Sequence, residues 1–421
     1  MTDTAAATAE VWRTESPRIV AALIRMTHDL GLAEDLAQDA LVAALEQWPA
    51  EGLPTNPAGW LMAVAKRRAV DQFRRAETLR LKTAHLAHDL EEAIVPDLDA
   101  AVDFIEDDVL RLVFLTCHPA LTPESRAALT LRLVGGLSTQ EIARAFLVKD
   151  TAMGQRISRA KRTLAEAGAT LELPTGRERA ERLADVMAVV YLIFNEGYAA
   201  TAGEDWMRPD LCLEGIRLAR LLAGLVPDDP EVHGLHALLE IQASRSVART
   251  DASGRPVLLE DQQRELWDQV RIRRGLDALA KAESVGGPIG RYVIQAAIAA
   301  CHARARSAAE TDWVRVAALY DLLARTAPGP VVEVNRAVAH GRAFGPEEGL
   351  RVLAGVPEGA LSGTPLHDSV RGDLLSRAGR QSEAAEAFRR AAASTANGGE
   401  RAVLLRRAEE NSVGAVSKTE P

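Results

Sequence analysis

The sequence has little of several features that mark particular classes of protein. It holds only three cysteines, Cys117, Cys212 and Cys301, and none lies in a CxxC pair. This spacing gives neither a disulfide framework nor a zinc-ligand pattern, and it is typical of a reducing compartment. No stretch reaches about 18 apolar residues, and the N-terminus has no basic segment before an apolar core. We therefore expect a cytoplasmic protein that makes no membrane contact.

Runs of β-branched residues with a period of two are also scarce. Apolar residues make up 47% of the 421 residues, and Ala and Leu dominate them. The sequence therefore predicts an all-α fold, with enough chain for two or three domains. The formal net charge is −9, so any contact with DNA has to come from local basic patches and not from the overall field.

Basic residues are absent between Arg25 and Lys66, where acidic residues are frequent. Leucines and alanines at helical spacing predict a helix here, with the carboxylates on its outer face. The balance then reverses, because residues 56–82 hold seven basic and two acidic residues. One face of a second predicted helix carries Trp60, Arg67, Arg68, Asp71, Arg74 and Arg75.

An aromatic ring among arginines suits unstacked bases and phosphates, since rings stack on bases and guanidinium groups pair with phosphate. The alternative is a core tryptophan beside a solvated basic face. Residues 83–110 follow, with nine acidic residues and no Lys or Arg. We expect residues 83–108 to form a flexible acidic linker, either a solvated tether or a mimic of nucleic-acid charge.

The stretch of residues 137–164 has the pattern of a helix-turn-helix. Ser138 and Glu141 form a capping box, and Asp150 is the expected N-cap of the second helix. That helix has an apolar stripe of Met153, Ile157, Ala160 and Leu164. Away from the stripe or beside it lie Gln155, Arg156, Ser158, Arg159, Lys161 and Arg162. These side chains suit a DNA major groove, and the alternative is the wet face of an ordinary amphipathic helix.

Two blocks of the sequence resemble the sigma-70 family in its extracytoplasmic-function group. "LAEDLAQDALVAALEQWP" followed by "NPAGWLMAVAKRRAVDQFRR" is similar to region 2, which we assign to residues 1–82. "LTPESRAALTLRLVGGLSTQEIARAFLVKDTAMGQRISRAKRTL" is similar to region 4, which we assign to residues 109–172. The order, the spacing and the intervening linker make the resemblance more specific than either block alone.

The resemblance implies a subunit that binds core RNA polymerase, through its β′ and β subunits, and directs it to promoter DNA. Region 2 would contact the −10 element through the Trp60 to Arg75 face, although Arg67 stands where many relatives carry Asn. Region 4 would contact the −35 element through the polar face of residues 155–162. The core polymerase would bind residues in the acidic helix that match the family's docking stretch, namely Glu34, Asp35, Gln38 and Asp39.

Residues 177–412 resemble the C-terminal extension of one subgroup of these factors, which is likened to tetratricopeptide repeats. Near its end, the small and large positions of one such helix pair are matched by Gly372, Leu375, Gly379, Ala384, Phe388 and Ala391. Stacked helix pairs offer a concave surface, so a protein partner of the extension is expected. Pro174 and Gly176 predict a domain boundary in residues 172–178, and residues 413–421 are expected to be a disordered tail.

No pattern in the sequence indicates an enzyme, since GxxxxGK[ST], HExxH and GxSxG are all absent. "GGPIGRY", residues 286–292, lacks the Lys of a phosphate loop, and His233 with His236 lacks further ligands, so we expect no catalytic residue, cofactor or metal. Two other functions stay open: a helical-repeat interaction module, and a ligand-responsive activator with a single helix-turn-helix. Only a sigma factor needs the acidic helix and the Trp/Arg face upstream of the helix-turn-helix.

Overall fold

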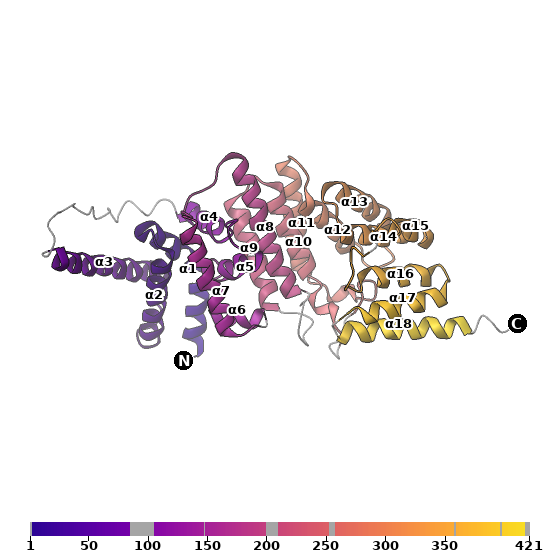
Figure 1. Ribbon diagram of the computed structural model, residues 1–421, viewed down its shortest axis with the longest axis horizontal. Coiled ribbons are helices and arrows are strands. Elements are labelled where there is room, and N and C mark those ends of the chain that lie inside the picture. The colour runs from indigo at the N-terminus through magenta and orange to yellow at the C-terminus, as the bar shows by residue number, and fades with distance from the viewer. Residues whose placement is uncertain are drawn as a thin grey trace. The chain divides into compact units, whose positions relative to one another are not determined.

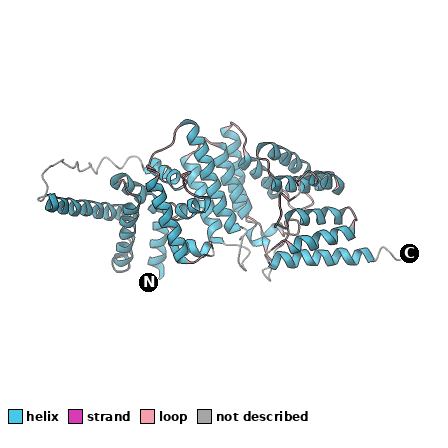
Figure 2. Cartoon of the chain, viewed as in Figure 1, coloured by secondary structure: helices cyan, strands magenta, loops and turns pink. Residues whose placement is uncertain are grey.

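The computed structural model describes residues 2–84, 105–146, 148–198, 209–251, 257–357, 359–395 and 398–416. These residues form eighteen α-helices and two short 3-10 helices, with no strand among them (Figure 1 and Figure 2). The predicted all-α fold is confirmed. Within the same ranges, no helix is both long and apolar enough to cross a membrane.

The chain divides into two compact units, Met1–Ile193 and Phe194–Pro421. The first unit contains α1 (Thr2–Thr27), α2 (Leu30–Glu51), α3 (Pro57–Ala84), α4 (Ile105–Thr116), α5 (Pro123–Leu133), α6 (Thr139–Ala145), α7 (Asp150–Glu166) and most of α8 (Gly176–Tyr198). The second contains α9 (Pro209–Leu225), α10 (Pro230–Ala243), α11 (Gln269–Val285), α12 (Arg291–Arg304), α13 (Trp313–Thr326), α14 (Pro330–Phe344), α15 (Pro346–Leu353), α16 (Leu366–Arg377), α17 (Gln381–Ala393) and α18 (Gly398–Val416).

The boundary between the units falls inside α8 and not in residues 172–178, where Pro and Gly predict it. The first turns of α8 belong to the first unit because they contact α4 and α5. The Arg182 guanidinium donates to the Phe114 carbonyl at 2.7 Å, and Asp185 pairs with Arg126 at 3.3 Å. Turn-forming residues mark where a helix begins, but the partners of that helix decide which unit it joins.

The N-terminal bundle, residues 2–84, consists of α1, α2 and α3. Helix α1 packs against both others, and α2 packs against α3. Its centre is apolar, with Leu23, Trp48 and Leu61 almost fully buried. The acidic N-cap Asp29 starts α2 by accepting from the Leu32 amide at 3.0 Å. The predicted acidic linker lies mostly in residues 85–104, outside the described residues, and α4 already begins at Ile105.

The helix-turn-helix segment, residues 105–166, comprises α4 to α7. The capping box at the start of α6 is confirmed, because the Glu141 amide donates to Ser138 Oγ and the Ser138 amide donates to Glu141 Oε2. The expected N-cap of α7 is wrong. Lys149 occupies that position, and Asp150 lies in the first turn of α7, where its charge complements the helix dipole.

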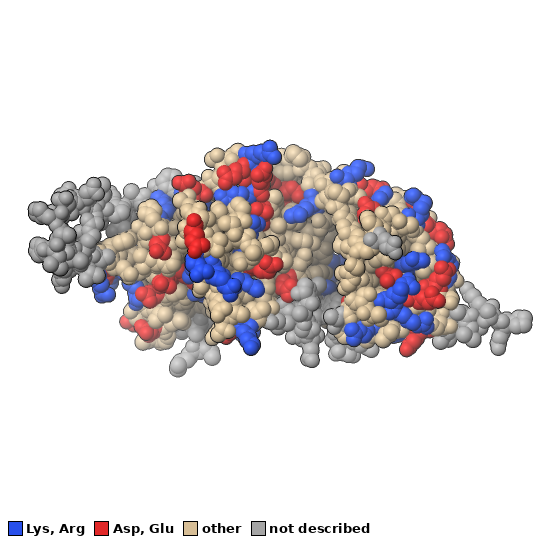
Figure 3. All heavy atoms as spheres, in the orientation of Figure 1, with Lys and Arg blue, Asp and Glu red and all other residues tan. Residues whose placement is uncertain are grey.

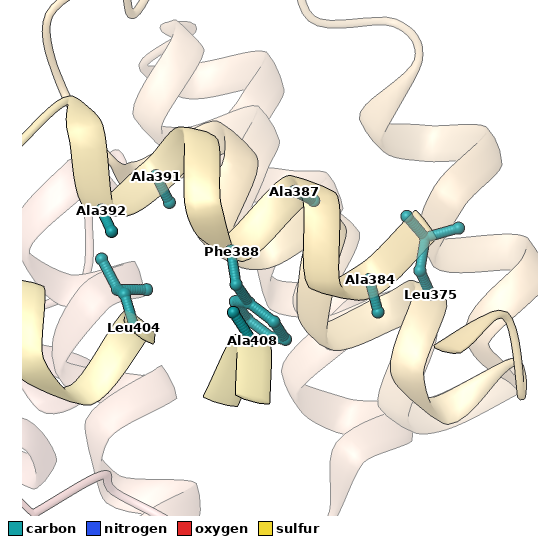
Figure 4. Packing of buried hydrophobic residues seen from close by; sticks show 8 residues of the cluster. All are labelled: Leu375, Ala384, Ala387, Phe388, Ala391, Ala392, Leu404 and Ala408. Carbon is teal, nitrogen blue, oxygen red and sulfur yellow. The ribbon is translucent and has the colours of Figure 1, made fainter. Parts of the chain in front are cut away.

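The second unit is built mainly from helices that pack on their sequence neighbours, including α13 on α14, α16 on α17 and α17 on α18. The α16–α17 pair has the core that the sequence predicts, with Leu375, Ala384 and Phe388 buried together against α18 (Figure 4). A Cβ added at Gly372 would lie 2.7 Å from the Phe388 ring, so the glycine makes room for the aromatic side chain. Helix α18 runs to Val416, so residues 413–416 of the expected tail are helical, and residues 417–421 lie outside the described residues.

Candidate nucleic-acid interface

Helix α7 presents a polar face opposite its apolar stripe. Met153, Ile157, Ala160 and Leu164 are all buried, which fixes the orientation of the helix. Gln155, Ser158 and Arg159 are exposed, and Arg159 Nη2 donates to Gln155 Oε1 at 3.4 Å. The Arg162 side chain is 70% exposed and pairs with Glu166 one turn on. The structure therefore brings these −35 candidates together on one accessible face.

The two flanking cations of α7 are less accessible than the sequence predicts. Arg156 and Lys161 are both half-buried. Lys161 forms an ion pair with Glu34 of α2, so its ammonium is directed toward the N-terminal bundle. In this conformation Lys161 is held away from the face formed by Gln155 and Arg159.

The Trp/Arg face of α3 is only partly exposed to solvent. Trp60 is half-buried and contacts Trp48 edge to face, with ring centroids 5.4 Å apart. This contact favours the core-tryptophan interpretation for one side of the ring. Arg68 pairs with Asp39 of α2 at 3.0 Å. Arg67, Asp71, Arg74 and Arg75 are exposed.

The four candidate polymerase-binding residues of α2 do not lie on one exposed face. Asp35 and Asp39 are exposed and Gln38 is half-buried, but Glu34 is buried, with its side chain 6% exposed. The expectation of an outer position is wrong for Glu34. Arg132 of α5 and Lys161 of α7 cover its carboxylate, and they lie about 100 and 130 residues away in sequence, so no local pattern points to them.

Charge on the surface is mixed in sign. On the face that Figure 3 shows, basic and acidic side chains lie interspersed over the described residues, without a broad field of one sign. On this face the mixture of signs agrees with the acidic net charge, so a contact with DNA would have to come from a local basic patch.

In the second unit, a carboxylate of the protein itself binds the backbone amides of the glycine-rich turn before α12. Glu231 accepts hydrogen bonds from the amides of Gly290, Tyr292 and Val293 at 2.9 to 3.1 Å. A helix N-terminus is a ready anion site, and here the carboxylate of α10 occupies it. The turn interpretation of "GGPIGRY" therefore fits the structure better than a phosphate loop.

The histidine pair and two of the cysteines lie in surroundings typical of residues that support the fold. His233 Nε2 lies 2.8 Å from the Pro227 carbonyl, and His236 lies 3.6 Å from Glu240. Among the described residues, no group of three or more His, Cys, Asp or Glu is placed to hold a metal ion. Burial raises the pKa of Cys117 to about 11 and that of Cys212 to about 12, which keeps both thiols protonated at neutral pH.

Comparison with known proteins matches three family models along the chain. A model of sigma-70 region 2 matches residues 11–78, and a model of sigma-70 region 4 matches residues 111–164. A family of unknown function, DUF6596, matches residues 182–283. The third match begins at Arg182, within the part of α8 that contacts the helix-turn-helix segment.

Relatives match the chain over different lengths. An uncharacterised protein of Rhizobium meliloti is 46% identical over 392 residues, which are 92% of this chain and 92% of that protein. The probable ECF RNA polymerase sigma factor SigI of Mycobacterium tuberculosis is 31% identical over 158 residues, 37% of this chain and 53% of that protein. The ECF RNA polymerase sigma factor SigX of Bacillus subtilis is 26% identical over 126 residues, 30% of this chain and 64% of that protein. No solved structure matches the chain.

Regions 2 and 4 in this order, with an arginine-bearing recognition helix, define a promoter-recognition class of transcription protein. The chain belongs to the extracytoplasmic-function group of the sigma-70 family and carries a C-terminal helical extension. Members of this family are non-catalytic regulators of transcription. The extension is shared with the Rhizobium meliloti protein, because that alignment covers nearly the whole of both chains.

Proposed function

We propose that this sigma factor binds core RNA polymerase in the cytoplasm and places region 2 on the −10 element and region 4 on the −35 element. The observation that carries the proposal is the exposed face of α7, where Gln155, Ser158, Arg159 and Arg162 lie together on a helix fixed by its buried stripe. Arginine and glutamine read base edges in the major groove, and flanking cations contact phosphates.

Substitutions on α7 test this assignment. We expect Arg159→Ala and Gln155→Ala to change base preference at the −35 element, with each lost base contact costing roughly 1–3 kcal/mol. Lys161→Ala should weaken binding to all sequences alike and lower its salt dependence. Promoter preferences of Arg159→Ala and Gln155→Ala identical to those of the wild type would refute the orientation of α7 on DNA.

For core polymerase, we propose that the exposed carboxylates Asp35 and Asp39 dock on a basic surface of the β′ subunit. Electrostatic docking of this kind should be sensitive to charge reversal and to salt. Asp35→Lys is the cleaner variant, because Asp39 also pairs with Arg68. We expect Asp35→Lys to abolish co-purification with core polymerase, whereas Glu51→Lys, at the end of the same helix and also exposed, should not. Equal retention of both variants at physiological salt would contradict the docking face.

The extension, we propose, modulates initiation by assisting the sigma domains, and does so through a protein partner bound to its stacked helices. Its charges are mixed in sign, whereas an inhibitor that mimics DNA should be strongly acidic. A chain ending at Ile193 should bind polymerase but initiate poorly, and adding residues 194–421 in trans should restore activity in part. A truncated chain more active than the full chain would make the extension an inhibitor.

A further inference from the structure

A cavity of about 350 Å³ lies inside the second unit and is lined by residues of α12, α13, α14, α16 and α18. Its walls are largely apolar and include Leu258, Trp313, Val338, Val370 and Leu404. Small-molecule sites are typically concave, mostly apolar and about 300–1,000 Å³ in volume, with a few polar groups that orient the ligand. The cavity therefore has the size of a site for a molecule of roughly ten to fifteen non-hydrogen atoms.

One residue of the cavity, Arg264, is a buried guanidinium without a carboxylate partner. It lies in the short 3-10 helix that precedes α11 and is 8% exposed. Its Nη1 donates to the carbonyls of His302 and Ala305, and its Nη2 donates to Thr311 Oγ1 at 3.0 Å. Its Nε has no hydrogen-bond partner, and none of the described Asp or Glu residues forms an ion pair with it. A buried charge with neutral acceptors alone is unfavourable, so an anion that enters the cavity would stabilise it.

The second polar group of the cavity is the imidazole of His302 on α12. The residue is 7% exposed, and its Nδ1 is buried without a hydrogen-bond partner. The ring packs edge to face on Trp313, with centroids 5.2 Å apart. Burial, together with the charges of Arg245 and Arg264, lowers the pKa of His302 to about 4, so the ring is neutral at pH 7. A neutral imidazole with its proton on Nδ1 can donate to a carboxylate oxygen.

The other charged groups around the cavity balance one another. Arg342 pairs with Glu260, and Arg407 pairs with Asp373 at 2.5 Å. Three arginines and three carboxylates line the cavity or pair with residues that do, namely Arg342, Arg377, Arg407, Glu260, Asp373 and Glu400. Because these six charges cancel, Arg264 leaves one positive charge in excess around the cavity.

We propose that this cavity, which we call the acid pocket, binds a small monocarboxylic acid with an apolar body, whose carboxylate accepts from Arg264 Nε and His302 Nδ1. The apolar body lies against Trp313, Val338 and Leu404 and excludes water from the ion pair, which strengthens it. A neutral molecule of the same shape leaves Arg264 without an anion and so binds more weakly. The acid pocket belongs to the extension alone, so the proposal does not depend on the contacts proposed for the sigma regions.

Octanoate is the probe for the acid pocket, and octanamide is its uncharged analogue. Calorimetry on the full chain measures the affinity for each. We expect octanoate to bind with a Kd on the order of 0.1 mM and octanamide to bind at least about tenfold more weakly. Octanoate at about ten times its Kd should also slow the exchange of the protected amides in α12 to α14 about tenfold. Equal affinities for the two molecules, or no binding of octanoate at millimolar concentration, would overturn the proposal.

Arg264→Met is the first variant, because it removes the charge and keeps a long apolar side chain. Arg273→Met on α11 is its matched control, since Arg273 is exposed and is not among the residues that line the cavity. We expect the affinity for octanoate to fall at least about tenfold in Arg264→Met and to stay unchanged in Arg273→Met, with the affinity for octanamide unchanged in both. Wild-type affinity for octanoate in Arg264→Met would rule out the assigned ion pair.

Val338→Trp is the second variant, because it leaves Arg264 and its hydrogen bonds in place. Val338 is half-buried on α14 and lines the cavity, so a larger side chain there fills the space that the probe needs. Val314→Trp on α13 is the control, since Val314 is 58% exposed. We expect Val338→Trp, but not Val314→Trp, to abolish octanoate binding and the slowed exchange. Octanoate that bound Val338→Trp as tightly as wild type would have its site elsewhere, which would refute the acid pocket.

Discussion

Glu240 of α10 is a buried, ionised side chain whose removal should disturb the second unit. Its carboxylate is fully buried, and Arg220 and Arg271 approach it at 2.6 and 3.1 Å, with His236 at 3.6 Å. Although burial raises the pKa of Glu240, His236, Arg220 and Arg271 lower it more strongly, to about 2 from an ordinary 4.5. The charged form is thus stabilised by the fold.

The size of the effect follows from the pKa. Each unit by which folding lowers a pKa contributes about 1.4 kcal/mol at neutral pH, giving roughly 3 kcal/mol for Glu240. Arg220 is 53% exposed, so water screens part of this interaction, and we expect Glu240→Gln to cost about 2 kcal/mol. Glu283→Gln on α11 is the control, because that carboxylate is exposed.

Hydrogen exchange of the slowest amides in α10 and α11 measures the loss of unfolding free energy within this unit alone. A cost of about 2 kcal/mol accelerates their exchange about 30-fold in Glu240→Gln. Because folding lowers the pKa of Glu240, the extra stability of wild type over Glu240→Gln should be complete above pH 4.5 and disappear as pH falls from 4.5 toward 2. The reasoning would be refuted if the amides of Glu240→Gln exchanged as slowly as those of wild type at pH 7. It would also be refuted if the difference in exchange between the two proteins were the same at pH 2.5 as at pH 7.

Three further predictions concern packing and caps. Phe388→Ala should destabilise α16 to α18 by roughly 3–5 kcal/mol, measured by hydrogen exchange, whereas Phe344→Ala, 56% exposed, should cost little. Glu231→Ala should leave three amides at the start of α12 without acceptors and raise their exchange, whereas Glu283→Ala should not. Arg182→Ala should destabilise α4 and α5 by about 1–3 kcal/mol in thermal melts, because it removes the bond to the Phe114 carbonyl, whereas exposed Arg179→Ala should have no effect.

Local patterns were sufficient to predict most of the helical architecture. The Ser138–Glu141 box and the stripe of Met153 to Leu164 depend only on neighbours in sequence, and both are present in the structure. Gly372 and Phe388 likewise follow a short repeat pattern.

Long-range contacts were not predictable in the same way. Glu34 fits the outer face of an amphipathic helix as well as Asp35 does, and it is buried by Arg132 and Lys161, which lie about 100 and 130 residues away. Helix α8 begins at Gly176, just after Pro174, and these two residues predict a boundary, yet Arg182 and Asp185 attach the start of the helix to the preceding domain. In both cases the contacts with a distant segment determine the result, namely the burial of Glu34 and the unit that the start of α8 joins. The local sequence does not indicate these contacts.

Transcription from a randomised promoter library, with purified core polymerase and the full chain, tests the central claim most directly. The account predicts that adding the chain creates new start sites whose upstream DNA shares two elements, near −10 and near −35. The same reaction with Arg159→Ala should keep the −10 element and change the −35 element. Start sites that are the same with and without the chain, or that share no second element upstream, would contradict the account.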